Sequence, residues 1–315
     1  TFHPQGSNIY TPTAGTKLIR LLLTGDSWMD PSTFRIMFDV CNSDATANHN
    51  LRPLAAPWAF FRRLRILAGG QVAEDIYYYN RIHQMMRTLI AKESIMNDCA
   101  EGFGYSLDDL KAIKAATDVT GIAPGQSQTV MFKPLSGLLS QDKYLPIRYC
   151  PLTIELELVD DPLEPVIAGV AAAVGMTQPF TTATTSTSWI IQQVQVKVDM
   201  CTLDNALDNS YAQHLLSGKA LPINYNTWVS QFQAIAGGDV QINVTRALTR
   251  LKSVFVTLDK DFTAGSYRDI FYRKKWNDFF SPMSLNNVAG KLTHNPDGEL
   301  QIQMQIGSKL FPEYP

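Results

Sequence analysis

The sequence predicts an all-β protein made of β-sandwiches, and three observations lead to this prediction. Apolar and polar residues alternate with a period of two in many segments, which is the pattern of a strand with one buried face. Helical spacing is confined to a few segments between strands, which argues against a doubly wound α/β fold. The chain has 315 residues, enough for two domains or one large β architecture.

The strands follow from the alternation itself. Ile36, Phe38 and Val40, for example, are interleaved with Met37 and Asp39, so one face of this segment is expected to be buried. The same criterion, with β-forming composition, predicts strands at 17–24, 34–40, 59–67, 70–77, 127–133, 153–159, 189–202, 222–235, 240–244, 251–259 and 300–306.

Three inserted helices are predicted, at 79–93, 106–117 and 204–217. The second opens at Ser106, a residue suited to an N-cap, and the third lies between Asp204 and Gly218. Many strands with a few inserted helices describe a β-sandwich, of which the jelly roll is the largest common form. The helix at 204–217 separates a first β unit of about 200 residues from a second set of strands.

Composition excludes several classes of protein. Lys and Arg number 27 against 29 Asp and Glu, for a net charge of −2, and only 18% of residues are charged. Neither a disordered chain nor a polybasic nucleic-acid binder fits, and a charge-poor surface is expected where much of it faces other protein. The longest small-apolar run, 166–176, is shorter than the ~20 residues of a membrane span.

No catalytic, cofactor or metal motif is found in the sequence, so no catalytic, cofactor-binding or metal-ligating residue is assigned, no cofactor is expected and the protein is predicted not to be an enzyme. The five histidines are scattered along the chain. The four cysteines form no C-x-x-C pair, which favours unpaired, mostly buried thiols in a reducing compartment.

Two basic clusters and two tryptophans are candidates for contact with other molecules. The clusters combine positive charge with neighbouring aromatic rings, which could hold phosphates, although a structural or protein-interface role is favoured. Tryptophans in loop-like surroundings are typical anchors of protein interfaces. The candidates for interface or genome contact are Arg62, Arg63, Arg65, Arg273, Lys274, Lys275, Trp28 and Trp58.

Three stretches together resemble a known family. The first runs from Leu51-Arg52-Pro53-Leu54 through Phe60-Phe61-Arg62-Arg63-Leu64-Arg65 to Tyr79-Asn80-Arg81. The second runs from Pro134-Leu135-Ser136-Gly137-Leu138-Leu139 through Leu145-Pro146-Ile147-Arg148-Tyr149-Cys150-Pro151-Leu152 to the strand at 154–159. The third is Gln305-Ile306-Gly307-Ser308-Lys309-Leu310-Phe311-Pro312-Glu313-Tyr314-Pro315. The chain is similar here to the double jelly-roll major capsid proteins of eukaryotic double-stranded DNA viruses. That lineage includes polinton-like viruses, large algal viruses and adenoviruses.

The resemblance implies a structural virion protein with two eight-stranded jelly rolls side by side. The implied domains are a first jelly roll over 1–203, with insertions at 41–58, 79–126 and 160–188, a connecting helix and linker over 204–220, and an incomplete second jelly roll over 221–315. Because proteins of this kind run longer, and the chain begins at Thr1 without a Met, we expect a portion of a longer product.

The expected partners follow from the same resemblance. The chain would form homotrimers that act as pseudo-hexagonal tiles, and trimer–trimer contacts would close an icosahedral shell around double-stranded DNA. Penton and minor capsid proteins and a weak, non-specific contact with the genome are further implied partners. The protein would be located in the virion and assembled inside the host cell.

Two other functions stay open from the sequence. A carbohydrate-binding jelly-roll module is suggested by Trp28, Trp58 and Trp189, which look exposed. A cupin-like metalloenzyme is suggested because cupins are also jelly rolls, although clustered His and Glu ligands are missing from the sequence.

Overall fold

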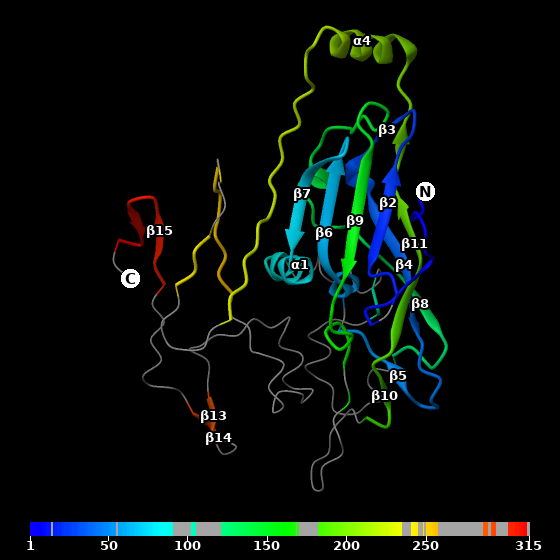
Figure 1. Cartoon of the computed structure of the whole chain (residues 1–315), viewed down its shortest axis with the longest axis vertical. Helices are drawn as coiled ribbons and strands as arrows, with labels where there is room; N and C mark the ends of the chain where they lie inside the picture. Colours follow the sequence, from blue (N-terminus) through cyan, green and yellow to red (C-terminus); the bar gives the residue numbers. More distant parts are fainter. Residues whose placement is uncertain are drawn as a thin grey trace.

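A computed structural model of the chain describes residues 1–13, 15–54, 56–90, 102–104, 121–167, 169, 182–234, 241–244, 248, 250–257, 286–288, 291–293 and 302–313. Two four-stranded antiparallel sheets face each other (Figure 1). The first sheet has the order β1 (Ile9–Tyr10), β11 (Trp189–Lys197), β4 (Arg35–Asn42) and β8 (Ser127–Phe132). The second has the order β2 (Leu18–Leu23), β9 (Leu152–Leu158), β6 (Phe61–Ala68) and β7 (Gln71–Tyr77).

The eight strands pair as one long hairpin that has been rolled up. The innermost pair is β6 with β7, followed outward by β4 with β8, β2 with β9 and β1 with β11. Rolling then brings β11 beside β4 and β6 beside β9, which joins the pairs into two sheets. This is the connectivity of a jelly roll, so the predicted fold is confirmed for the first domain.

The core lies between the two sheets and follows from the alternation. In β4 every second residue is buried, and Ile36, Phe38 and Val40 have no exposed surface. The ring of Phe38 lies edge-on to those of Phe61 and Phe132, with ring centres 5.3 and 6.3 Å apart. Edge-to-face aromatic pairs add packing energy to the burial of their area. These rings therefore tie the two sheets together at the middle of the sandwich.

Shorter elements make up the rest of the described secondary structure. The short strands are β3 (Trp28–Met29) with β12 (Met200–Cys201), the parallel pair β5 (Asn50–Leu51) and β10 (Thr185–Ser186), and the hairpins β13 (Asn286–Val288) with β14 (Lys291–Thr293) and β15 (Met304–Ile306) with β16 (Lys309–Phe311). The 3₁₀ helices are η1 (Pro31–Thr33), η2 (Pro57–Phe60) and η4 (Leu138–Ser140).

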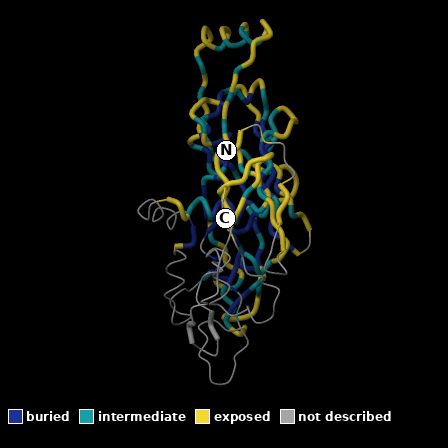
Figure 2. The backbone as a smooth tube through the Cα atoms, turned by 90° about the vertical axis from the view of Figure 1, so that its left-hand side faces the viewer, coloured by how far each residue is buried: buried dark blue, intermediate teal, exposed yellow. Residues whose placement is uncertain are grey.

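Two of the three predicted helices are found. Helix α1 (Tyr79–Thr88) follows β7 directly and buries Tyr79, Ile82 and His83. Helix α4 (Asn205–Leu216) is capped by Asp204 and has no buried residue. It lies beyond one end of the sandwich, and the chain then returns beside β7 (Figures 1 and 2). The predicted helix at 106–117 lies outside the described residues.

Three of the four strand predictions for the second half are wrong where they can be compared, and the fourth is found in part. Residues 222–234, 241–244 and 251–257 have no regular secondary structure, and of the predicted strand at 300–306 only Met304–Ile306 is found. A strand needs a hydrogen-bonded neighbour, and the described residues of the first three segments have no such neighbour in the described part of the chain. The alternation of apolar and polar residues thus indicates which side chains need burial, but it does not show which strand would pair with the segment. The second jelly roll stays a prediction.

We expect Phe38→Ala to lower the free energy of unfolding by about 3–5 kcal/mol, because it removes the ring at the centre of the aromatic contacts and leaves a cavity. Denaturant unfolding measures the loss. Leu18→Ala on β2, a residue 43% exposed, is the control and should cost less than about 1 kcal/mol. Equal losses from the two variants would contradict the central role of Phe38.

Candidate functional site: the charged face and the end loops

The arginines of β6 are held in ion pairs on the outer face of the second sheet. The Arg63 guanidinium donates to both carboxylate oxygens of Asp75, at 2.8 and 2.9 Å, and lies 4.0 Å from the centre of the Tyr77 ring. The Asp75 hydrogen bonds raise the pKa of Arg63 above its ordinary value. Arg62 pairs with Asp160 at the end of the sheet. A bidentate pair of this kind orients both side chains.

Glu155 on β9 is the acidic centre of this face. It is only 7% exposed, and its two oxygens form ion pairs with Arg20 and Arg65, each at 3.2 Å. Glu157, two residues along, lies 3.8 Å from Arg63. Arg20, Arg63 and Arg65 thus oppose Asp75, Glu155 and Glu157, and the charges of the face cancel. We call these six residues the charged face.

The charged face changes the interpretation of the basic cluster. Arg62, Arg63 and Arg65 were candidates for interface or genome contact, and each guanidinium has an acidic partner within its own domain. Their contacts thus favour a structural role in the sheet. The other cluster, Arg273, Lys274 and Lys275, lies outside the described residues.

The tryptophans expected at the surface are buried, which corrects that prediction. Trp28 is 7% exposed, and its ring centre lies 4.7 Å from that of Tyr211 in α4. Trp58 is 6% exposed, stacks on His83 at 4.1 Å and donates from Nε1 to Gln84. The residues that cover both tryptophans come from elements distant in sequence, so the local sequence pattern could not predict their burial.

Trp189 is also buried, at 2% exposure, with its Nε1 donating to the carbonyl of Pro162 at 2.8 Å. The three rings that suggested a carbohydrate-binding module are therefore buried and do not form an exposed sugar-binding surface. His83 beside Trp58 is fully enclosed, and burial lowers its pKa to about 3, which keeps the imidazole neutral.

No group of three or more His, Cys, Asp or Glu side chains within the described ranges could hold a metal ion. Of the cysteines, Cys41, Cys150 and Cys201 are free thiols of intermediate exposure, and Cys99 lies outside the described residues. None of the described helices has the length and apolar character of a membrane span.

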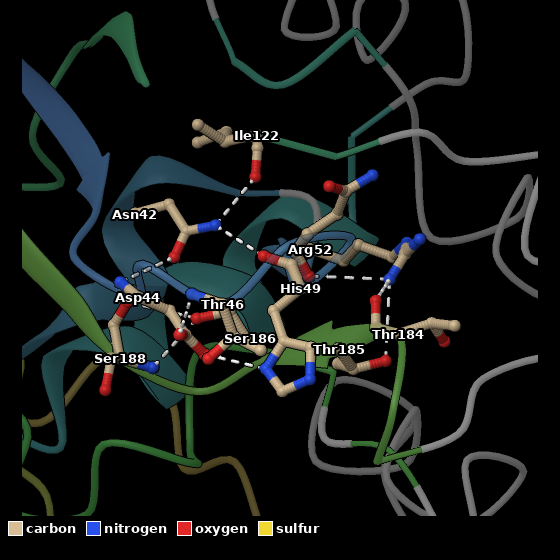
Figure 3. Close-up of polar contacts among 11 residues, drawn as sticks. Asn42, Asp44, Thr46, His49, Arg52, Ile122, Thr184, Thr185, Ser186 and Ser188 are labelled. Atoms are coloured by element: carbon tan, nitrogen blue, oxygen red, sulfur yellow. Dashed lines mark hydrogen bonds and ion pairs between the residues drawn. The ribbon is translucent and has the colours of Figure 1, made fainter. Parts of the chain in front are cut away.

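A second polar cluster ties three loops together at the end of the sandwich opposite α4 (Figures 1 and 3). Asn42, fully buried at the end of β4, donates from Nδ2 to the carbonyls of His49 at 2.8 Å and Ile122 at 3.0 Å. Nearby, Arg52 donates to the carbonyl of Thr184 at 2.8 Å. We call this the end-loop cluster.

Asp44 organises the turn within the end-loop cluster. Its carboxylate accepts from the backbone N–H of Thr46 at 2.8 Å and pairs with Nδ1 of His49 at 2.9 Å (Figure 3). The backbone hydrogen bond from Thr46, followed by the side-chain hydrogen bond with His49, lowers the pKa of Asp44 to about 2. Sequence reasoning placed insertions in these loops but missed the cluster, whose only local signal is the Asn42-Ser43-Asp44 turn composition.

No known protein family and no curated protein sequence matches the chain. Three viral capsid structures are among the solved structures similar to it. One is the quasi-atomic model of the PBCV-1 virus capsid, at 14% identity and a TM-score of 0.38 over 67% of this chain and 44% of that one. Another is the crystal structure of the mavirus major capsid protein, at 11% identity and a TM-score of 0.32 over 66% of this chain and 47% of that one.

The third is PBCV-1 VP54 fitted into a reconstruction of the virophage Sputnik, at 12% identity and a TM-score of 0.36 over 68% of this chain and 44% of that one. The chain is similar to viral capsid proteins. It spans less than half the length of each of these three structures.

We expect Asn42→Ala to destabilise the protein by about 1–3 kcal/mol, because the carbonyls of His49 and Ile122 lose their side-chain donor in a buried place. Denaturant unfolding measures this loss. Ser43→Ala, at the exposed neighbouring position, is the control and should change little. A loss no larger than that of the control would contradict the role given to Asn42.

The pH dependence of stability tests Asp44. Because its pKa is lowered from 3.8 to about 2 in the folded protein, its stabilising effect is complete above pH 3.8 and is lost as the pH falls toward 2. Asp44→Asn should therefore melt below the unaltered protein at pH 5, and the difference should close between pH 4 and pH 2. Melting temperatures measured at matched pH decide this, and a difference that widens in acid would contradict it.

Proposed function

We propose that the protein is a structural subunit of a viral capsid, a major capsid protein that assembles through large contacts with copies of itself. The observation that carries the proposal is the combination of an eight-stranded jelly roll in the first half with described residues of the second half whose apolar side chains are exposed. The three sequence stretches that resemble major capsid proteins support it independently.

The exposed apolar side chains of the second half need a cover. Between 40 and 60% of the surface of each is exposed: Val229, Phe232, Ile242, Val244, Leu248, Leu251, Val254, Phe255, Val256, Ile302, Ile306, Leu310 and Phe311. Apolar surface on this scale is typical of chains that bury it against other protein. In the proposal, residues 221–315 contribute to a second jelly roll and its neighbours cover these side chains.

Two of the resembling stretches meet in the sandwich, which gives their sequence a physical reason. Glu74 on β7, 1% exposed, accepts hydrogen bonds from Ser136 Oγ and from the backbone N–H groups of Gly137 and Leu138. A buried carboxylate is stabilised by several such donors. The pair of stretches thus forms one structural unit on the side of the sandwich where the chain returns from α4.

The proposed assembly is a homotrimer that acts as a pseudo-hexagonal tile, with weaker trimer–trimer contacts closing an icosahedral shell around double-stranded DNA. Penton and minor capsid proteins, and weak genome contact, belong to the same proposal. The end-loop cluster supports an arrangement in which the sandwich stands with one end toward the surface of the shell, because the loops at 42–52, 121–122 and 184–188 gather at one end. The protein would reside in the virion.

The mass of the chain in solution tests the proposal. Light scattering on the purified chain at micromolar concentration should give the mass of three copies, and electron microscopy should show particles of hexagonal outline or shells. A stable monomer under these conditions would overturn the proposal. Glycan binding by a monomer would instead favour the carbohydrate-binding module.

A further inference from the structure

Strand β7 lies at the edge of its sheet, and the backbone on its outer side has no strand neighbour among the described residues. Edge strands present free N–H and C=O groups on which another chain can add a strand. Val72 is 50% exposed and Tyr77 is 37% exposed, so apolar surface lies along this edge. The pairing of β7 with β6 shifts register between Ile66 and Leu67, which opposes strand addition only locally. The rest of the edge needs a cover.

The chain that returns from α4 covers this edge. We call residues 222–232 the strap. Tyr225 donates from its hydroxyl to the carbonyl of Ala73 at 2.9 Å, and Ser230 donates to the carbonyl of Tyr77 at 2.5 Å. The two acceptors are four residues apart on β7, as expected for carbonyls on the same side of a strand. The strap thus occupies the edge with side-chain donors rather than with a β-ladder.

Further contacts hold the strap along its length. Lys143 donates from Nζ to the carbonyl of Pro222 at 2.9 Å, and the Phe232 ring lies 5.4 Å from that of Tyr78. Ile223, Tyr225 and Trp228 pack against the hydrophobic core. The strap is therefore held at both of its ends as well as by its two hydrogen bonds to β7.

Gly137 provides the notch into which the strap backbone fits. A Cβ atom at this position would overlap the carbonyl group of Asn226. The backbone of Gly137, with φ −69° and ψ −38°, is one that any residue adopts, so turn geometry does not require a glycine here. The hydrogen bond from its N–H to Glu74 on β7 fixes the notch beside the edge. The absence of a side chain therefore serves the close approach of the strap.

We propose that the strap is an edge cap, which keeps β7 from adding a strand of a second copy of this chain. An uncovered β7 would bind an extended segment of another copy through main-chain hydrogen bonds, and such pairing is available to every copy because the edge is identical in each. Covering an edge with a loop is one of the ways in which proteins avoid this association. The inference does not rest on the proposed function.

Gly137→Ala tests the edge cap, because its methyl group displaces the strap while its backbone stays favourable. Gly25→Ala is the matched control, since a Cβ there meets only Ile147 and Met200 at ordinary contact distances of 3.5 and 3.9 Å. Chymotrypsin should cleave the strap at Tyr225, Trp228 or Phe232 about tenfold faster in Gly137→Ala than in the control, because cleavage follows the population of the open strap.

Light scattering over a concentration series gives the second readout. The Gly137→Ala protein should form species larger than those of the unaltered protein, increasingly so with concentration. Val72→Lys, added to Gly137→Ala, should restore the unaltered mass, because a charged edge opposes strand addition. If Gly137→Ala does not fold, the double variant Tyr225→Phe with Ser230→Ala carries the same test by removing the two donors to β7.

Three outcomes would overturn the inference. Unchanged cleavage would mean that the notch does not hold the strap, and faster cleavage without larger species would mean that the strap does not guard the edge. Larger species that persist with Val72→Lys would place the association at another surface. A failure of the trimer prediction would leave these readouts intact, because each compares a variant with the unaltered chain.

Discussion

The structure depends on one constraint, which is that each of the eight strands must bury one of its two faces between the same pair of sheets. Rolling a hairpin satisfies this constraint, because strands far apart in sequence become neighbours while every pair stays antiparallel. The aromatic contacts of Phe38 then join β4 to its neighbour β8 and, across the core, to β6. The opposite faces of the strands can then carry polar contacts. The second sheet carries the charged face there, and the end loops are joined by the end-loop cluster.

Three polar side chains, Glu155, Glu74 and Asn42, each bind more than one partner. Glu155 forms ion pairs with two arginines, and Glu74 accepts hydrogen bonds from the Ser136 side chain and from backbone N–H groups of the following loop. Asn42 donates hydrogen bonds to two backbone carbonyls. Each of these groups is buried or nearly so, and each has its partners in place. Buried polar groups with complete partners favour one arrangement of the surrounding loops, because any other arrangement leaves a donor or acceptor without a partner.

Much of the first domain could be predicted from the sequence, and the rest depended on contacts between distant residues. The alternation of Ile36, Phe38 and Val40 predicts a half-buried strand because side-chain direction in a strand is a local property. The cluster of Arg62, Arg63 and Arg65 could not be interpreted in the same way, since the acidic partners Asp75, Glu155 and Asp160 are brought close only by the fold. Trp58 was misjudged for the same reason, because His83 covers it from a helix that follows two strands later.

The second half marks the limit of such reasoning in another way. Residues 241–244 and 251–257 have the composition of strands, yet no ladder forms among the described residues there. Local composition determines which side chains are apolar, while the strand with which a segment pairs depends on the rest of the fold. The strap is the opposite case, because its residues looked like a strand and instead form specific contacts along an edge.

The cancelling charges of the charged face have a kinetic consequence. A face whose three arginines are matched by three carboxylates has almost no field at distances beyond the Debye length of about 8 Å at physiological salt. An approaching protein would be neither steered toward this face nor repelled from it. Encounters there would proceed at the unsteered rate of roughly 10⁵–10⁶ M⁻¹s⁻¹ and would change little with ionic strength.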